Sequence, residues 1–162
     1  MNAILVSDTH GDIASLSAIL QLERDARLCL HAGDYARDLW LAGLPDGMKG
    51  FAVCGNCDGY SAGAPLFEIL SLGATKIYLC HGHEHGVKSG ELTELVDKAL
   101  YLGCNTAVFG HTHLPLLENR SGVLLINPGA ANPHKARGGL PGYALLELGE
   151  GGQVEGVRFK PL

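Results

Sequence analysis

Metal-binding side chains directly follow five apolar stretches of this 162-residue sequence. They occur in Ser7-Asp8-Thr9-His10, Gly33-Asp34, Gly55-Asn56-Cys57-Asp58, His81-Gly82-His83 and Gly110-His111-Thr112-His113. Carboxylates, imidazoles and an amide oxygen are ligands that hard and borderline divalent ions accept. The seven best candidates exceed the needs of one four-coordinate ion, so they predict a two-metal hydrolase site: Asp8, His10, Asp34, Asn56, His81, His111 and His113.

The elements that would bring these ligands together are strands of an open α/β sheet. Apolar, β-rich runs precede them at Ala3–Val6, Leu28–Leu30, Phe51–Val53, Ile77–Cys80 and Ala107–Phe109. The carboxyl ends of such strands share one edge, where ligands bind. Asp34 is the expected bridging carboxylate. His111 and His113 are two residues apart, so both face the crevice only if their segment leaves strand geometry.

Hydrophobic periodicity predicts helices between these strands. One covers Ile13 to Leu20 after an Asp12 N-cap, one covers Leu92 to Leu100 after Ser89, and a weaker one covers Ala36–Leu41. The second half has short strands that predict a meander: Leu114–Leu117, Val123–Ile126, Tyr143–Leu148 and Val154–Phe159. Periodicity alone therefore predicts an α/β fold with an antiparallel portion.

Length and composition predict one domain over residues 1–162, because no repeat, low-complexity tract or linker interrupts the chain. We expect no membrane span and no signal peptide, since apolar runs are short and no basic region precedes them. The odd count of five cysteines, four of them in or beside apolar strands, favours free thiols and a cytoplasmic location. The C-x-x-C at Cys54 and Cys57 is also compatible with a redox pair.

The net charge of −5 argues against binding along a nucleic-acid backbone, which requires clustered Lys and Arg. Bound divalent ions would reverse the local sign of the site and attract a phosphate. The sequence leaves the oligomeric state undecided between a monomer and a homo-oligomer, because Leu114–Leu117 and Val123–Ile126 suit either an interface or the core of a second sheet.

In this order the motifs resemble those of the calcineurin-like metallophosphoesterases: D-x-H, G-D, G-N-[H or C]-[D or E], a single H and G-H-x-H. The resemblance runs from Asp8 to about Asn127 and is nearest to small single-domain phosphodiesterases of the YfcE type. It implies a four-layer α-β-β-α sandwich of two mixed sheets flanked by helices. It also implies that Asp8, His10 and His113 hold one metal, that Asn56, His81 and His111 hold the other, and that Asp34 bridges both.

The chain departs from the wider superfamily at Cys57, where a histidine usually helps to bind phosphate or protonate the leaving group. The small phosphodiesterases share this substitution, so it argues against a general phosphatase. His83 is the expected alternative proton donor, with His85 as a further candidate. Cys57 could also be a covalent nucleophile, a hypothesis that a Cys57→Ala variant would test. His31, Asp58 and Asn127 are expected to support the site or to be ordinary core and turn residues.

These features predict a metal-dependent phosphodiesterase that cleaves small phosphodiesters with a hydroxide bridging two metals. We expect two divalent ions, Mn²⁺ first, with Ni²⁺, Zn²⁺ or Fe²⁺ as alternatives. The alternatives are a phosphomonoesterase or nuclease with the same metals, and a non-catalytic scaffold, since the retromer scaffold subunit shares the fold. Retention of all seven ligands argues against the scaffold, and the lack of a basic groove argues against a nuclease.

Overall fold

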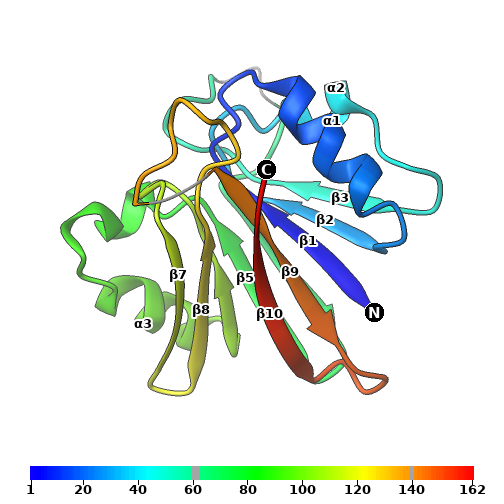
Figure 1. Cartoon of the computed structure of the whole chain (residues 1–162). Helices are drawn as coiled ribbons and strands as arrows, with labels where there is room; N and C mark the ends of the chain where they lie inside the picture. Colours follow the sequence, from blue (N-terminus) through cyan, green and yellow to red (C-terminus); the bar gives the residue numbers. More distant parts are fainter. Residues whose placement is uncertain (60–62, 139–140) are drawn as a thin grey trace.

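Two five-stranded mixed sheets form the centre of the fold (Figure 1). The computed structural model describes residues 1–59, 63–138 and 141–162. The first sheet has the order β10-β9-β1-β2-β3, with β1 (Asn2–Val6), β2 (Leu28–His31), β3 (Lys49–Ala52), β9 (Gly142–Leu148) and β10 (Val154–Pro161). The second has the order β4-β5-β6-β8-β7, with β4 (Phe67–Leu72), β5 (Thr75–Cys80), β6 (Thr106–Val108), β7 (Pro115–Arg120) and β8 (Val123–Pro128). Each sheet has three parallel strands, β1-β2-β3 and β5-β6-β8, and the rest pair antiparallel.

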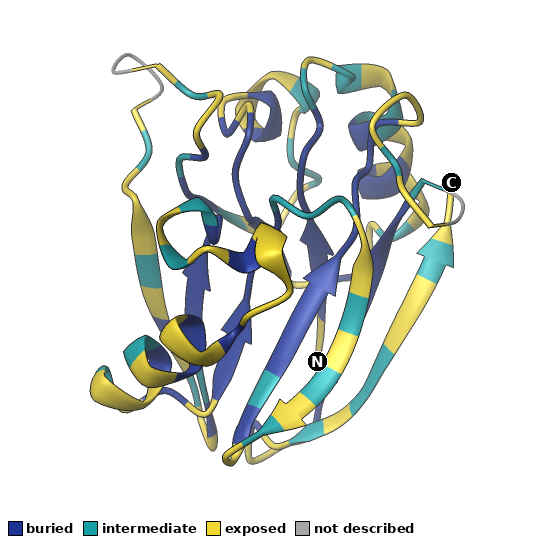
Figure 2. Ribbon diagram, turned by 90° about the vertical axis from the view of Figure 1, so that its left-hand side faces the viewer, coloured by how far each residue is buried: buried dark blue, intermediate teal, exposed yellow. Residues whose placement is uncertain are grey.

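Helices cover the outer face of each sheet. Three apolar clusters separate the layers, one between the sheets, one under α1 (Ile13–Leu22) and α2 (Asp38–Ala42), and one under α3 (Thr93–Tyr101). Figure 2 shows buried strands inside and exposed residues on the outer faces of the helices. The predicted α-β-β-α sandwich of two mixed sheets is therefore confirmed.

The helices follow the apolar periodicity with differences at their ends. In α1, Leu16, Ile19 and Leu20 are buried, and the Asp12 carboxylate accepts a hydrogen bond from Ser15 N at 3.0 Å, as expected of an N-cap. In α3 the predicted Ser89 cap is wrong, because the helix begins at Thr93 and its N-cap residue is Leu92. Ser89 instead ends a short 3₁₀ turn, η2 (Val87–Ser89), which follows η1 (His83–His85).

The predicted meander is wrong, because its hairpins belong to different sheets. β7 and β8 pair in the second sheet, whereas β9 and β10 pair in the first. β8 also pairs in parallel with β6, so most of it is core. β4 went unpredicted because it is an edge strand and its sequence, Phe-Glu-Ile-Leu-Ser-Leu, does not alternate apolar and polar residues, although exposed residues alternate with more buried ones in the structure.

All five cysteines lie among the described residues and are free thiols. Burial raises the pKa of Cys29 and of Cys80 to about 12, so both behave as apolar core residues at neutral pH. Within the described part of the chain, no helix is long and apolar enough to cross a membrane.

The C-terminal strand is tied to the first helix by a polar contact. Glu23 Oε1, at the end of α1, accepts hydrogen bonds from Tyr143 OH at 2.6 Å and from Lys160 Nζ. Burial opposes the charged form of Glu23, but Lys160 and Tyr143 outweigh it and lower the pKa below its ordinary 4.5. This carboxylate therefore stabilises the fold while it is ionised.

Replacing Glu23 with Gln is expected to lower the free energy of unfolding by about 2 kcal/mol and Tm by roughly 4–8 °C at pH 7. A carboxyl with a lowered pKa contributes stability above its unfolded pKa and loses it as pH falls through the folded value. The difference between wild type and Glu23→Gln should thus shrink below about pH 4.5 in thermal melts. Glu150→Gln, at an exposed position, is the control. A difference that stays constant to pH 3 would contradict this role.

Candidate metal centre

The candidate ligands lie in loops at one end of the sandwich. These loops follow β1, β2, β3, β5 and β6 and lie at the upper edge of both sheets in Figure 1. Backbone bonds join them, because Asp8 N donates to Gly33 O at 3.0 Å and Gly110 N donates to His81 O at 3.1 Å. The expected shared edge is thus a feature of the structure.

Four of the candidate ligands form a tight cluster: Asp8, His10, Asp34 and His113. Each offers a ligand atom, and these atoms lie within 4.8 Å of one another. His113 Nε2 lies 3.1 Å from Asp8 Oδ1, and His10 Nε2 lies 3.4 Å from Asp34 Oδ2. Two ligands roughly 2.1 Å from one tetrahedral ion are about 3.4 Å apart, so these spacings fit a shared cation.

Backbone carbonyls set the tautomers of two histidines. His113 Nδ1 lies 3.0 Å from Lys135 O, and His81 Nδ1 lies 2.7 Å from Ala32 O. A carbonyl oxygen can only accept, so each Nδ1 donates and each neutral ring presents a lone pair at Nε2. His81 Nε2 lies 3.3 Å from Asp34 Oδ1 and has no hydrogen-bond partner among the described residues.

These side chains are arranged for binding a metal rather than for hydrogen bonding to one another. A lone pair aimed at a carboxylate oxygen is repelled unless a cation or a proton lies between them. Asp8 Oδ1 and His10 Nε2 are likewise buried without a hydrogen-bond partner in the described part of the chain. Metal-binding histidines usually donate their other ring N–H to a carbonyl or carboxylate, as His81 and His113 do.

The remaining candidates lie beside this cluster. The His111 ring packs edge-on against the His81 ring, with centroids 4.9 Å apart. The backbone N–H of His111 donates to Asp8 Oδ2 at 3.1 Å. Asn56 is exposed, and its amide Nδ2 donates to Cys57 Sγ at 3.6 Å. The structure thus brings His81 and His111 together and places Asn56 in a loop whose Cys57 N–H binds Asp34 Oδ1 at 2.8 Å.

Burial and opposite charges compete at the carboxylates and at His81. Burial favours the neutral acids, but hydrogen bonds and charges from the neighbouring histidines outweigh it and hold the pKa of Asp8 and Asp34 below the ordinary 3.8. Burial also opposes a charged His81, yet Asp34 and Asp8 together raise its pKa above 6.5. At His111, burial and the charge of His81 lower the pKa to about 4. His111 is therefore neutral at neutral pH, whereas a metal at His81 competes with a proton that the two carboxylates favour.

Five of the seven candidate ligands have left-handed backbone conformations. The φ angle is 55° at Asp8, 46° at His10, 58° at Asp34, 68° at His111 and 61° at His113. Such conformations cost about 1–3 kcal/mol each in a non-glycine residue and gather at functional sites. They also explain how His111 and His113 face the same cluster, because their segment has left strand geometry as expected.

The glycine before three of the ligands makes room for the cluster. A Cβ on Gly33 would lie 2.7 Å from His81 Nδ1, and one on Gly55 would lie 2.5 Å from Asp34 N. A Cβ on Gly110 would overlap the Ser7 hydroxyl. Close approach of the loops, rather than a turn alone, therefore accounts for glycine in the G-D, G-N and G-H pairs.

A buried polar network holds the first loop from beneath. The Thr9 hydroxyl donates to Asp38 Oδ2 at 2.7 Å, and Gly11 N donates to the same oxygen at 2.8 Å. His31 Nδ1 accepts from Gly33 N at 3.2 Å, so its Nε2–H faces Thr9 Oγ1 at 3.0 Å. Burial lowers the pKa of His31 to about 4, which keeps it neutral. His31 thus supports the site, and sequence reasoning missed Thr9 and Asp38, which carry no metal motif.

Other polar residues hold the remaining loops. Asn127 Nδ2 donates to Gly110 O at 2.8 Å, and Asn132 Nδ2 donates to Thr9 O at 3.0 Å. Asp58 joins two ligand loops, because its carboxylate accepts from Ala36 N at 2.9 Å and from Gly55 N at 2.8 Å. Asn127 and Asp58 therefore have the supporting role that the sequence left open.

His83 and Cys57 differ in what they present to the site. The His83 ring lies 5.4 Å from the His81 ring between centroids, and its buried Nδ1 has no hydrogen-bond partner among the described residues. Burial and the charge of Asp34 raise the pKa of the Cys57 thiol to about 11, which leaves it protonated at neutral pH. His85 instead hydrogen-bonds Tyr78 OH at 2.8 Å, away from the ligands.

Two hollows open beside the cluster. One of about 350 Å³ is lined by Gly11, Ile13, Tyr35, Arg37, Asp38, Leu41, Cys57, Asp58 and Gly59. The other, of about 550 Å³, is lined by Cys54, Gly55, Asn56, Asp58, Gly59, Ala64, Leu66 and His83. The shared residues Asp58 and Gly59 make them neighbours, so they can take different parts of one substrate.

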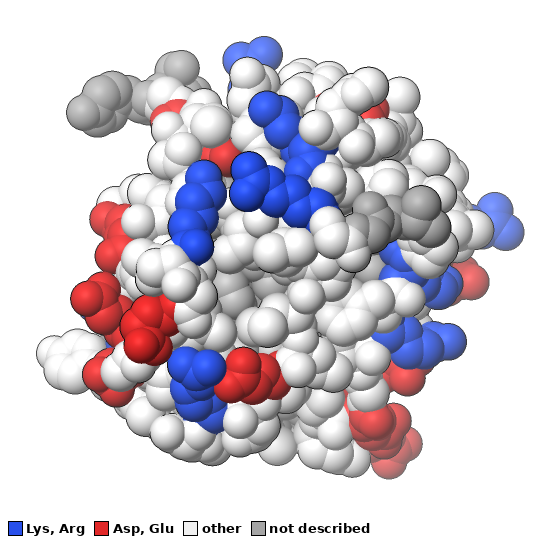
Figure 3. All heavy atoms as spheres, turned by 60° about the vertical axis from the view of Figure 1, so that its left-hand side comes forward, with Lys and Arg blue, Asp and Glu red and all other residues white. Residues whose placement is uncertain are grey.

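Positive charge lies close to the ligands although the chain is acidic overall. Besides burial, Lys88 contributes to lowering the pKa of His111, and Lys135 to lowering that of His10. Figure 3 shows several Lys and Arg side chains close together on the upper part of one face, while acidic side chains lie mainly at its left, lower and right edges. This local field favours an anionic substrate.

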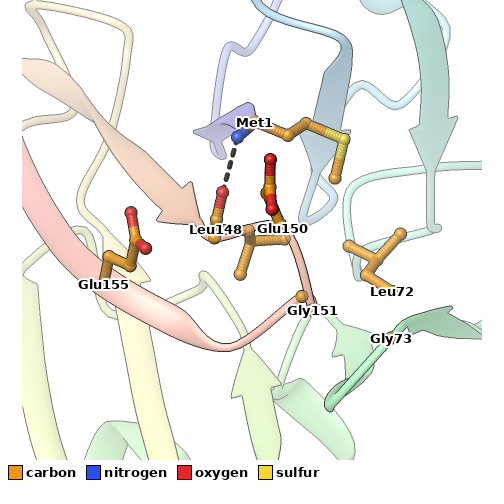
Figure 4. Close-up of a pocket in the computed structure, with 9 residues that line it drawn as sticks. Met1, Leu72, Gly73, Leu148, Glu150, Gly151 and Glu155 are labelled. Carbon is orange, nitrogen blue, oxygen red and sulfur yellow. Dashed lines mark hydrogen bonds between the residues drawn. The ribbon is translucent and has the colours of Figure 1, made fainter.

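A further hollow, of about 590 Å³ and drawn in Figure 4, lies at the opposite end of the sandwich in Figure 1. It is lined by Met1, Leu72, Gly73, Leu148, Gly149, Glu150, Gly151, Gly152 and Glu155, none of which is a candidate site residue. The Met1 ammonium group donates to Leu148 O at 2.5 Å, so the chain's own N-terminus occupies its edge. This hollow is therefore separate from the candidate metal ligands.

The calcineurin-like phosphoesterase superfamily domain matches residues 1–151 of this chain. A probable metallophosphoesterase of Bacillus subtilis, YsnB, is 33% identical over 150 residues, which cover 91% of this chain and 85% of YsnB. The phosphodiesterase YfcE of Escherichia coli is 28% identical over 172 residues, covering 91% of this chain and 88% of YfcE. The crystal structure of Vps29 from Chaetomium thermophilum superposes with a TM-score of 0.75 at 17% identity, covering 98% and 96% of the two chains, and shows the fold alone.

Proposed function

Because this chain belongs to the calcineurin-like phosphoesterase superfamily, we propose that it is a metal-dependent phosphodiesterase of small phosphodiesters. The observation that carries the proposal is the pair of histidine lone pairs directed at carboxylates. His81 and His113 each present Nε2 to Asp34 or Asp8, with Nδ1 tied to a backbone carbonyl. This arrangement supports metal binding over a purely structural cluster.

In this proposal Asp8, His10 and His113 hold one divalent ion, and His81, His111 and Asn56 hold a second. Asp34 has one oxygen facing His10 and the other facing His81, as a bridging carboxylate requires. Two ions, when bound, activate water as the nucleophile and neutralise charge on the phosphoryl oxygens. Mn²⁺ is the ion we would supply first.

The protein's own part is to position the ester and to supply a proton. His83 lines the larger hollow beside Asn56, so it can reach a leaving group placed there. Burial and His81 lower the pKa of His83, and an anionic phosphodiester bound beside it would raise that pKa. Cys57, held as a thiol, supplies no imidazole for phosphate, which favours diesters over monoesters.

The test compares bis(p-nitrophenyl) phosphate with p-nitrophenyl phosphate. Metal-stripped wild type and Asn56→Ala are each titrated with Mn²⁺ while nitrophenolate release is followed. We expect Mn²⁺ to restore diester cleavage in wild type, with a much slower monoester reaction and a large loss in Asn56→Ala. Faster monoester cleavage would favour a phosphomonoesterase, and silence on both esters despite metal uptake would favour a scaffold.

Replacing His83 with Ala should separate leaving-group protonation from metal binding. Nitrophenolate leaves without a proton, so its diester should react within about two-fold of wild type. A diester with an alkoxide leaving group should slow by roughly 10²- to 10⁴-fold. His134→Ala, at an exposed loop position, is the control. Equal losses on both diesters would show that His83 is needed for the structure of the site instead.

A further inference from the structure

The smaller hollow is built by the same loops that carry the candidate ligands. Its lining residues Gly11, Tyr35 and Cys57 each directly follow a candidate ligand in the sequence. One substituent of a phosphoryl group bound at the candidate metal centre can therefore reach this hollow. The volume of about 350 Å³ lies in the range of roughly 300–1,000 Å³ that small-ligand sites occupy.

Tyr35 is held in a strained conformation that leaves its ring open to solvent. Its φ of 68° follows the 58° of Asp34, and a bulky residue rarely adopts such an angle. Tyr35 as a whole residue is 40% exposed, and the centroid of its ring lies 5.5 Å from that of His10 at a tilt of 50°. The ring thus borders a candidate ligand and the hollow without being buried in the core.

Neighbouring residues leave this ring accessible. A Cβ on Gly11 would lie 3.8 Å from Tyr35 Cε1, so a longer side chain at that position would approach the ring from the hollow. Ile13 and Leu41 extend the apolar surface, and Leu41 is 55% exposed. An aromatic face flanked by aliphatic side chains suits a flat, uncharged group.

The charged residues that line the hollow also favour an uncharged group. Asp38 and Asp58 line the hollow, and their carboxylates already accept hydrogen bonds from Thr9, Gly11, Ala36 and Gly55. Arg37 is the cation among the lining residues. One cation against two carboxylates disfavours a second phosphate in this hollow.

We infer that the hollow binds a planar aromatic substituent of the phosphodiester, a nucleobase or an aryl group, stacked on Tyr35. This inference rests on the proposed function and adds to it the class of substrate. Stacking of a base on an aromatic side chain changes affinity by roughly 5- to 150-fold.

The kinetic test uses two diesters with the same leaving group, thymidine 5′-(p-nitrophenyl) phosphate and methyl p-nitrophenyl phosphate. Tyr35→Asn removes the ring but keeps a residue that tolerates positive φ, Tyr35→Phe keeps the ring, and Tyr101→Asn changes a tyrosine that is 84% exposed on α3. We expect Tyr35→Asn to raise KM at least ten-fold for the thymidine ester alone. Unchanged KM values, or equal losses on both esters, would overturn the inference.

A binding measurement separates this inference from the proposed function. Calorimetry with the Mn²⁺-loaded protein compares adenosine 5′-monophosphate with ribose 5-phosphate, which lacks the base. Wild type, Tyr35→Phe and Tyr101→Asn should bind the nucleotide at least ten-fold more tightly, and Tyr35→Asn should lose that preference. Absence of a preference in wild type would overturn the inference even if both diesters are cleaved. A preference without cleavage of either diester would support the hollow and contradict the phosphodiesterase.

Discussion

Replacing Asp34 with Asn is expected to lower Mn²⁺ affinity at least 100-fold and diester hydrolysis by roughly 10³-fold or more. Loss of groups that merely orient ligands already costs about 10- to 100-fold, so loss of a bridging charge should cost at least as much. Asn keeps the size of the side chain, tolerates the φ of 58°, and can still accept from Cys57 N. The change therefore tests the charge of Asp34 with little effect on packing.

Asp12→Asn is the matched control for this variant. Asp12 is a carboxylate two residues beyond His10, but it caps α1 through Ser15, and Asn caps helices as well as Asp does. Mn²⁺ affinity by calorimetry and diester turnover should both stay near wild type. If Asp34→Asn also kept both, with its fold verified by circular dichroism, Asp34 could not be the bridging ligand.

Gly55→Ala is expected to reduce diester hydrolysis by about 100-fold without removing any ligand. The added methyl group would press on the Asp34 backbone N and carboxylate, and a displacement of about 1 Å at such a site can cost 100-fold in rate. Crowding of this kind also destabilises folds by about 1–3 kcal/mol. We therefore expect a lower Tm together with weaker Mn²⁺ binding.

Gly59→Ala, in the same loop, provides the comparison. Among the residues that the structure describes, a Cβ on Gly59 would meet nothing within 4 Å, so this substitution should leave metal affinity and Tm near wild type. Equal activity of the two variants would mean that the approach of the Gly55 loop to Asp34 is not required for catalysis.

The candidate ligands could be predicted from sequence because their types stand out at strand ends. A histidine or an aspartate directly after an apolar strand is informative, and parallel strands bring such positions to one edge. Even the irregular geometry of His111 and His113 followed from their spacing. The resemblance to a known family supplied the division of the ligands between two metals, which remains a prediction.

The supporting contacts could not be predicted, because they join segments distant in sequence through ordinary residues. Lys135 binds His113 through its backbone carbonyl, which any residue would offer. Thr9 meets Asp38 across 29 positions, and nothing in either segment marks the pair. The strained Tyr35 was also missed, although a bulky residue directly after a glycine–aspartate turn is a signal that could have been used.

Sheet membership was the weakest part of the predicted fold. Strand runs identified β7, β8, β9 and β10, but a hairpin signal does not say which sheet the hairpin joins. That choice depends on which layer each strand's faces contact, as the three separate apolar clusters show. The overall class was therefore predictable where the topology was not.

The most direct test of the central claim is an anomalous difference map from crystals of the wild-type protein soaked in Mn²⁺. Two peaks are expected on either side of Asp34, one among Asp8, His10 and His113, and one among His81, His111 and Asn56. No peak beside Asp34 under saturating Mn²⁺, or a single peak that leaves His81 and His111 without an ion, would contradict the two-metal site.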